Sequence, residues 1–485
     1  MTIRALCIHG HFYQPPREDP LTGVVPREVG AAPYRNWNER IHAECYRSNA
    51  VLDNFERISF NVGPTLLDWM VEYDPATCRR IVEQDRANMR QFGVGNAIAQ
   101  AYNHVIMPLA TSADKRTQIA WGIADFEHRF GRRPQGMWLP ETAVDLETLA
   151  IMADMGIEFT LLAPWQADRD DVDPTEPYRV ALPEGRSISV FFYHQGLSGR
   201  VSFDPSLTTN ADAFALHDLP AQYHPEKLRR GEPHLLLVAT DGELYGHHQP
   251  FRDLFLAHLL KTASAQNGIA PTFPARWLRE HPPRRTIGIR ERTSWSCHHG
   301  VTRWMDDCGC TPSESRWKAH LRGALDQLAG ALDQIYIETL HPFIADPWAL
   351  RDRYIHVMLG ALPAAELIDE AAGRRLPEDE IRRIHMLLKA QRERQRMFTS
   401  CGWFFDDFDR IEPKNNVAYA AQAVLLTRVA TGVDLALAAL AALRRVESHR
   451  TGLRADKVFA KHLRRAREYG ERNLAIEAAP AAVAG

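Results

Sequence analysis

The clearest sign of the architecture is the stretch Leu-Leu-Leu-Val-Ala-Thr-Asp, residues 235–241, a short apolar run that ends in an acid. A similar run, Gly-Met-Trp-Leu-Pro-Glu at residues 136–141, ends in a second acid 100 positions earlier (241 minus 141). Short apolar runs that alternate with helices are typical of buried parallel strands. Both acids are therefore predicted at the carboxyl ends of strands, which form the active face of parallel α/β architectures.

The first 290 residues or so alternate strand-like and helix-like segments. Helices are predicted before the stop signals Gly131 and Pro134, and over residues 144–155 before Gly156. A closed barrel is favoured over an open sheet, because polar residues repeatedly follow the strands. The predicted strands are Ala5–Ile8, Ile58–Val62, Gly136–Leu139, Phe159–Leu162, Ile188–Tyr193 and Leu235–Thr240.

From about residue 291 the pattern becomes helical. A long helix is predicted to begin with Thr311 as N-cap, Pro312 at its first position and Glu314 in a capping box. Its apolar stripe consists of Trp317, Leu321, Leu325, Leu328, Leu332 and Ile335, at spacings of three and four. The predicted organisation is a catalytic barrel over 1–290, an α-helical domain over 291–477, and a disordered tail over 478–485.

The composition excludes several classes of function. The formal net charge is -3 over 485 residues, which argues against a nucleic-acid partner. No apolar stretch is long enough to cross a bilayer, and the first residues lack the pattern of a signal peptide. Seven irregularly spaced cysteines argue against a disulfide framework. The expected location is cytoplasmic, and no oligomeric state is predicted.

The two acids have distinct predicted roles. Glu141, beside Trp138 and Pro140, is rigidly placed, as a nucleophile must be, although it could instead cap the following helix. Asp241 follows an apolar strand, where partial desolvation raises the pKa of a carboxyl group and suits a general acid. The alternative is an aspartate that ends the strand through an Asx turn. Glu243 is a further acid or a ligand for sugar hydroxyls.

Histidines cluster at His9/His11, His247/His248 and His298/His299, and with Asp241 could hold a catalytic zinc ion. The loop around Cys297, Cys308 and Cys310 also has the residue types of a zinc site. However, its Cys-x-Cys gap is tighter than the usual spacing of about two to four intervening residues, and no second Cys-x-x-Cys lies nearby. We therefore predict no metal and no cofactor.

Four segments, in order, resemble the motifs of glycoside hydrolase family 57. His-Gly-His-Phe-Tyr-Gln-Pro at residues 9–15 is similar to the opening motif, with two extra residues between His11 and Gln14. Gly-Asn-Ala-Ile-Ala-Gln at 95–100 stands at the second motif. Trp-Leu-Pro-Glu at 138–141 and Thr-Asp-Gly-Glu at 240–243 match the third and fourth, and 295–304 is the candidate fifth.

The resemblance implies an incomplete seven-stranded (β/α) barrel followed by helices, and a metal-free retaining activity on α-linked glucans or maltooligosaccharides. Glu141 would be the nucleophile and Asp241 the general acid/base. The remaining predicted substrate-binding residues are His9, His11, Gln14, Trp37, Asn96, Trp138, Glu243, His248, Trp295, His298, Trp304, Trp403, Phe404 and Asp407, of which the last three would bring the helical domain to the cleft. The alternatives are a metal-dependent polysaccharide deacetylase or zinc glycosidase on a related barrel, and a non-catalytic carbohydrate-binding protein.

Overall fold

The computed structural model describes residues 4–311 and 313–478, and the chain forms two compact units. The first unit comprises Met1–Pro16 and Arg27–Val301, and the second comprises Arg17–Pro26 and Thr302–Gly485. This division differs from the predicted boundary after residue 290 and adds an early segment to the second unit. The predicted tail lies outside the described residues, except Ala478 at the end of α21.

Seven parallel strands form the barrel of the first unit, as the resemblance to the family implies. Single bridges, Phe60 to Ala97 and Gly136 to Phe159, join β2 to β3 and β4 to β5. After β7 ends, the backbone N–H of His194 donates to the carbonyl of Leu237 in β8 (2.7 Å). The barrel strands are β1 (Arg4–Phe12), β2 (Ser59–Val62), β3 (Ala99–Gln100), β4 (Met137–Trp138), β5 (Phe159–Leu162), β7 (Ser187–Phe192) and β8 (His234–Asp241).

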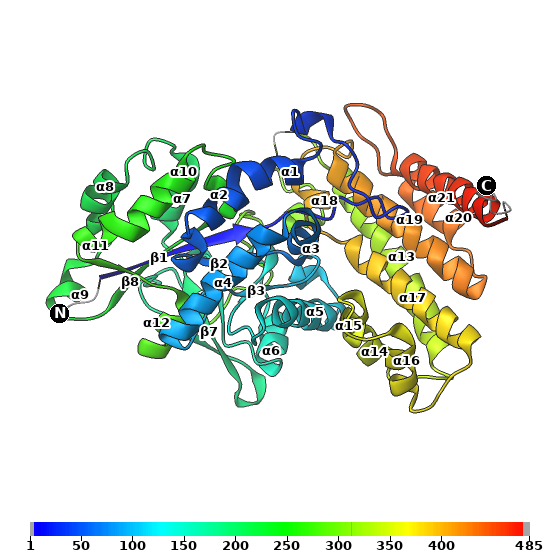
Figure 1. The fold of residues 1–485 in the computed structure, drawn as a ribbon, viewed down its shortest axis with the longest axis horizontal. Coiled ribbons are helices and arrows are strands. Elements are labelled where there is room, and N and C mark those ends of the chain that lie inside the picture. Colours follow the sequence, from blue (N-terminus) through cyan, green and yellow to red (C-terminus); the bar gives the residue numbers. More distant parts are fainter. Residues whose placement is uncertain (1–3, 312, 479–485) are drawn as a thin grey trace, which may run out of the picture. The chain divides into compact units, whose positions relative to one another are not determined.

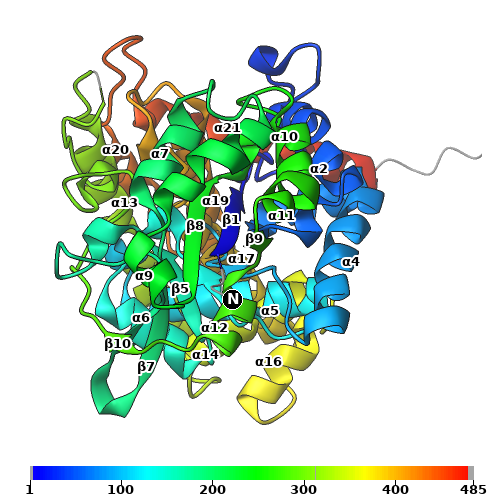
Figure 2. The ribbon, with the colours of Figure 1, turned by 90° about the vertical axis from the view of Figure 1, so that its left-hand side faces the viewer.

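Three short strands extend this arrangement. β9 (Ile269–Pro271) pairs in parallel with the first half of β1, which lies between β8 and β9 in Figure 2. β6 (Tyr178–Ala181) runs antiparallel to β7, and β10 (Arg285–Thr286) pairs with β6. These strands broaden the sheet without carrying either acid.

Strand alternation explains how the active face is built. Ala5 and Cys7 of β1 share one core cluster with Leu235, Leu237 and Ala239 of β8. Because side chains on one face recur every second residue, His9, His11 and Asp241 continue the same faces toward the carboxyl ends. His11 and Asp241 are register partners across the β1–β8 ladder.

Helices surround the strands of the first unit (Figures 1 and 2). α5 ends where Gly131 adopts φ 69°, and Asp145 caps α6 by accepting from the N–H of Thr148 (2.8 Å), so both predicted helices are confirmed. The helices are α1 (Trp37–Ile41), α2 (Arg47–Val51), α3 (Pro64–Tyr73), α4 (Pro75–Phe92), α5 (Ser112–Phe130), α6 (Leu146–Asp154), α7 (Gln195–Phe203), α8 (Ala211–Ala213), α9 (Pro225–Arg229), α10 (Arg252–His258), α11 (Ser264–Gln266) and α12 (Pro274–Glu280).

The second unit is helical, as predicted. α19 packs against α17, α13 and α21, and the stripe from Trp317 to Leu332 is buried. None of the helices within the described part of the chain combines the length and apolarity needed to cross a membrane. The helices are α13 (Trp317–Leu340), α14 (Pro347–Arg353), α15 (Ile355–Met358), α16 (Ala364–Ala372), α17 (Glu378–Arg396), α18 (Cys401–Phe404), α19 (Ile411–Thr431), α20 (Ala436–Leu443) and α21 (Ala455–Ala478).

The predicted start of the long helix is wrong. α13 begins at Trp317, and its N-cap position is Arg316 rather than Thr311. The reason is local, because the carboxylate of Asp307 accepts from both the backbone N–H and the hydroxyl of Ser315 (each 3.0 Å). Residue 312, the predicted first position, lies outside the described residues.

Candidate active site

Glu141 and Asp241 follow β4 and end β8 at the carboxyl ends of these strands, and the charge of Glu141 acts on Asp241. Burial of its carboxyl group, and secondarily the negative charge of Glu141, raise the pKa of Asp241 to about 7. Asp241 as a whole residue is nevertheless exposed at the end of β8, so its carboxyl group lies close to the solvent-facing surface. An accessible acid that is still half protonated near neutrality is suited to donate a proton.

The backbone at Glu141 is strained. Glu141 has φ 58° and ψ 21°, and the β-branched Thr142 has φ 47°, so two consecutive residues occupy the left-handed region. Gln166 holds this turn by accepting from the hydroxyl of Thr142 and donating to its carbonyl (both 2.8 Å). Strain of this kind is maintained by the surrounding structure and gathers at functional sites.

Two neighbouring side chains orient the carboxylate of Glu141. The indole Nε1 of Trp295 donates to Oε2 of Glu141 (3.0 Å), and the hydroxyl of Ser296 donates to the same oxygen (2.7 Å). The backbone N–H of Trp295 also donates to the carbonyl of Glu141 (3.0 Å). The loop at 295–296 therefore fixes both the backbone and the carboxylate of the predicted nucleophile.

Glu243 is a buried acid beside this pair. The hydroxyl of Tyr46 and the backbone N–H of Tyr13 donate to its Oε1 (2.6 and 3.0 Å). Burial raises the pKa of Glu243 to about 8, although the hydrogen bond from Tyr46 opposes the shift. Gln14 donates to the hydroxyl of Tyr46 (3.3 Å), which links the opening motif to Glu243.

Buried histidines continue the inward face of β1. His9 Nδ1 lies 2.9 Å from Ser59 Oγ, and His9 Nε2 lies 3.3 Å from Asn61 Oδ1. His11 contacts Asn61 through Nδ1 and His104 through Nε2 (2.9 and 3.1 Å). Burial lowers the pKa of both His9 and His11 to about 3, so both rings are neutral at pH 7.

Trp138 lies beneath these histidines. Its ring stacks on His9 and on His11 (centroids 4.9 and 5.0 Å apart), and Trp295 meets it edge-on at 5.0 Å. Because Trp138 and His9 have no exposed surface, they support the site rather than present a face to a sugar. Trp295 is partly exposed and remains a stacking candidate.

The other predicted sugar-binding residues of the first unit differ in how exposed their side chains are. Asn96 is buried, and its amide donates to the carbonyls of Phe55 and Ile58 (both 2.5 Å), so its role is structural. Trp37 is partly exposed and lies edge-on to His247, whose ring contacts that of His248. The prediction of a sugar-binding role for Asn96 thus fails because the backbone already occupies its amide.

The predicted residues of the second unit serve mainly as packing. Trp304 and Trp403 have no exposed surface, and the indole N–H of Trp403 donates to the carbonyl of Lys318 (3.3 Å). Asp407 is buried, and its Oδ2 lies 2.6 Å from Nδ1 of His449. Phe404 is partly exposed beneath the guanidinium of Arg303, 4.7 Å away. Burial makes Trp304, Trp403 and Asp407 poor candidates for sugar contact.

Several residues of the site were not predicted from the sequence. Tyr46, Ser296 and Gln166 act through hydrogen bonds that no sequence motif marks. His104, at φ 55°, stacks on Tyr13 with centroids 3.8 Å apart. Ser296 could have been found, because it directly follows the predicted Trp295.

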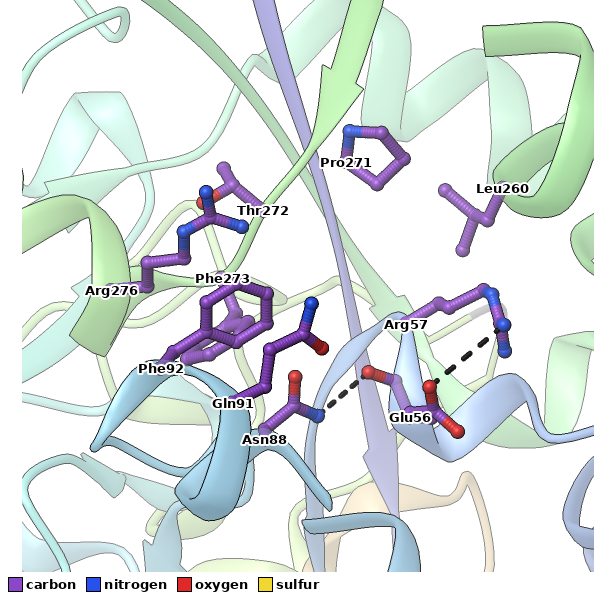
Figure 3. Close-up of a pocket in the computed structure, with 10 residues that line it drawn as sticks. All are labelled: Glu56, Arg57, Asn88, Gln91, Phe92, Leu260, Pro271, Thr272, Phe273 and Arg276. Carbon is purple, nitrogen blue, oxygen red and sulfur yellow. Dashed lines mark hydrogen bonds and ion pairs between the residues drawn. The ribbon is translucent and has the colours of Figure 1, made fainter. Parts of the chain in front are cut away.

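A separate pocket of about 290 Å³ lies at the opposite ends of the strands (Figure 3). Glu56 and Arg57 precede β2, Phe92 precedes β3, and Pro271 ends β9 opposite Leu6. The amino-terminal ends of barrel strands are associated with stability rather than catalysis. This pocket is therefore distinct from the site around Glu141 and Asp241.

The carboxyl ends of the barrel strands thus carry two carboxyl groups in different surroundings, Asp241 with a raised pKa and Glu141 held by two hydrogen-bond donors. The chain belongs to glycosyl hydrolase family 57, which matches residues 39–290. Residues 314–480 match a domain of unknown function, DUF3536. Among curated proteins, no relative matches the chain.

Solved structures share this fold at low sequence identity. An exo-type maltose-forming amylase from Pyrococcus sp. ST04 is 16% identical, with a TM-score of 0.73 over 96% of this chain and 89% of that chain. A branching enzyme from Pyrococcus horikoshii is 14% identical, with a TM-score of 0.60 over 96% and 94%. The α-amylase AmyC from Thermotoga maritima is 12% identical, with a TM-score of 0.57 over 94% and 99%. At these identities the similarity shows the fold alone.

Proposed function

We propose that this protein is a retaining glycosidase or glucanotransferase that acts on α-glucans or maltooligosaccharides. Glu141 is the nucleophile and Asp241 the general acid/base. The substrate class is supported by the family and by the named activities of the amylases and branching enzyme that share the fold. The main support for the mechanism is the pKa of Asp241, raised to about 7 by burial and by the charge of Glu141.

The reaction takes two displacements. Glu141 attacks the anomeric carbon while Asp241 protonates the departing glycosidic oxygen, so the carbon–oxygen bond to the leaving sugar breaks as the glycosyl–enzyme ester forms. Asp241, now ionised, removes a proton from water or from an acceptor hydroxyl. That oxygen attacks the same carbon and releases Glu141. Water gives hydrolysis, whereas a sugar acceptor gives transfer or branching.

The surroundings of the acids fit these roles. Trp295 and Ser296 orient the carboxylate of Glu141 before attack, which lowers the entropic part of the barrier. We assign the exposed His248 to a sugar hydroxyl, and Trp37 and Trp295 to stacking. His11 and Glu243 are buried and hydrogen-bonded within the protein, so we assign them to positioning. Burial and the charge of His247 lower the pKa of His248, and a neutral imidazole can exchange hydrogen bonds with a hydroxyl without adding a positive charge.

Product analysis tests the proposal. The protein is incubated with maltooligosaccharides, the products are separated, and proton NMR follows the anomeric signals during the first turnovers. Initial release of the α-anomer supports retention. Shorter sugars alone indicate hydrolysis, longer sugars indicate disproportionation, and new α-1,6 linkages indicate branching. Initial release of the β-anomer would refute the retaining mechanism.

Substitution of the nucleophile provides the second test. Glu141→Gln keeps the size of the side chain and should nearly abolish turnover, with unchanged circular dichroism. Glu158→Gln, an exposed glutamate just before β5, is the matched control and should be fully active. Wild-type turnover by Glu141→Gln would show that another group is the nucleophile. A catalytic zinc ion at Asp241 would be lost from Asp241→Asn, and its removal from the wild-type protein would abolish turnover; we expect neither result.

A further inference from the structure

A cluster of soft metal ligands lies in the loop that follows Ser296. The Sγ atoms of Cys297, Cys308 and Cys310 and a ring nitrogen of His299 all lie within 4.8 Å of one another. Zinc with Zn–S bonds of about 2.3 Å holds tetrahedral sulfur ligands about 3.8 Å apart. Small side-chain movements would therefore bring all four atoms into coordination.

The backbone of residues 297–310 is shaped to gather these ligands. Gly300 adopts φ 76°, and a side chain at this position would collide with the carbonyl of Arg292. Gly309, at φ 70°, turns the chain between Cys308 and Cys310. Asp307 accepts from the N–H of Gly309 (3.1 Å) and so stabilises this turn. The left-handed conformation of Gly309 lets one residue separate the two cysteines, although this gap is narrower than in most structural zinc sites.

We propose that Cys297, His299, Cys308 and Cys310 bind a zinc ion that holds the loop supporting Glu141. Three thiolates and an imidazole favour zinc among the common cellular divalent metals. Four protein ligands fill a tetrahedral shell, so the ion is structural and leaves no position for a substrate. Such a site would contradict the prediction, made from the sequence, that the protein holds no metal.

The position of the site in the chain gives the ion a second effect. Cys297 is covalently adjacent to Ser296, and both Ser296 and Trp295 donate to Oε2 of Glu141. Fixing Cys297 by coordination restricts the backbone that carries these two donors. Trp295 and Ser296 are therefore positioning residues whose geometry depends on the metal. This part of the inference rests on the proposed nucleophilic role of Glu141.

Metal content tests the site independently of activity. The full chain is produced with added zinc, purified without chelator and analysed by plasma mass spectrometry, with one zinc ion expected per chain. Cobalt replacement should give the intense visible bands of tetrahedral thiolate coordination. A Cys308→Ser/Cys310→Ser double variant should lose both signals. Zinc at background level in the wild-type protein, or unchanged in the double variant, would overturn the proposal.

Matched substitutions refine the ligand assignment. His299→Ala should weaken zinc binding, and His299→Cys should restore it by replacing one ligand type with another. His298→Ala changes the exposed neighbour outside the cluster, and Cys401→Ser changes a cysteine in α18; both should keep their zinc. Loss of zinc from His298→Ala but not from His299→Ala would refute the assignment of His299.

Kinetics then test the effect on Glu141. Removal of zinc should lower kcat about tenfold with KM nearly unchanged, and zinc should restore it. In Ser296→Ala, removal should have a smaller effect, because one donor is already absent. Equal kcat with and without bound zinc would refute the positioning role alone. Bound zinc in a protein without glucan activity would refute the proposed function but leave the metal site intact.

Discussion

Ser296 donates a 2.7 Å hydrogen bond to Oε2 of Glu141, although the two residues lie 155 positions apart in the sequence. This contact joins the loop after the barrel strands to the end of β4. The same oxygen accepts from Trp295, so two donors define the rotation of one carboxylate. The contact suggests a direct test of how far orientation contributes to catalysis.

Ser296→Ala should lower kcat/KM about 10- to 100-fold, because a hydrogen bond to a charged group contributes about 1.5–3 kcal/mol. Steady-state kinetics on a maltooligosaccharide measures the effect. Ser187→Ala, at the exposed start of β7, is the control and should match the wild-type protein. Unchanged kcat/KM in Ser296→Ala would show that the contact does not orient the nucleophile.

Asp241→Asn should separate the two chemical steps. With a glucan substrate, loss of the general acid should reduce kcat about 10²- to 10⁴-fold. With an aryl α-glycoside, whose leaving group needs no protonation, the first step should stay fast and the glycosyl–enzyme should accumulate. Rapid-quench mass spectrometry detects that species as a mass increase on Glu141. Equal losses on both substrates would contradict the acid role.

Activity should fall as the pH rises through about 7, where Asp241 loses its proton. The proton-donor form exists below this pKa, so kcat/KM should show its basic limb near pH 7. A profile of kcat/KM from pH 5 to 9 checks the prediction. A basic limb more than about one pH unit from pH 7 would indicate that another group controls protonation of the leaving oxygen.

The same carboxyl groups should make folding stability decrease with rising pH. In the folded protein Asp241 and Glu243 titrate near 7 and 8, whereas free carboxyl groups titrate near 4. Between these values the folded state holds protons that the unfolded chain has released, so the free energy of unfolding falls as the pH rises. Thermal melts should show a smaller decrease for Asp241→Asn than for Asp170→Asn, an exposed control.

Gly242→Ala should disturb Asp241 through packing, because a Cβ at position 242 would collide with the ring of Phe12. Overpacking of this kind destabilises a protein by about 1–3 kcal/mol. Gly199→Ala in α7 is the matched control, since its added methyl group meets no atom within 4 Å and alanine favours helix. The midpoint temperature of thermal unfolding and kcat should both fall for Gly242→Ala and stay unchanged for Gly199→Ala.

Much of the barrel could be predicted because its strands are continuous apolar runs. The six predicted strands coincide with β1, β2, β4, β5, β7 and β8, and the acids follow from where two of these runs end. β3 was missed because its two residues are too short to show a period. The early segment Arg17–Pro26 could not be assigned to the second unit, because long-range packing leaves no local pattern.

Site residues could be predicted where an acid or aromatic side chain stands at the end of a predicted strand. They were missed where the residue that hydrogen-bonds to such an acid comes from a distant segment of the chain. Asp241 follows from its strand, but Tyr46 lies in a helical segment and reaches Glu243 only through the tertiary fold. Asn96 was misassigned because an amide in a motif gives no sign of whether backbone carbonyls occupy it. The register between β1 and β8, which pairs His11 with Asp241, likewise cannot be predicted from the sequence because it depends on how two distant strands align.

The left-handed backbone at Glu141 has an evolutionary consequence. Glycine or asparagine would occupy φ 58° at a lower conformational energy than glutamate does. Under the proposed mechanism, this position keeps a less favourable residue because its carboxylate is the nucleophile. If selection for turnover were relaxed in a descendant of this protein, we expect this glutamate to be among the first residues replaced.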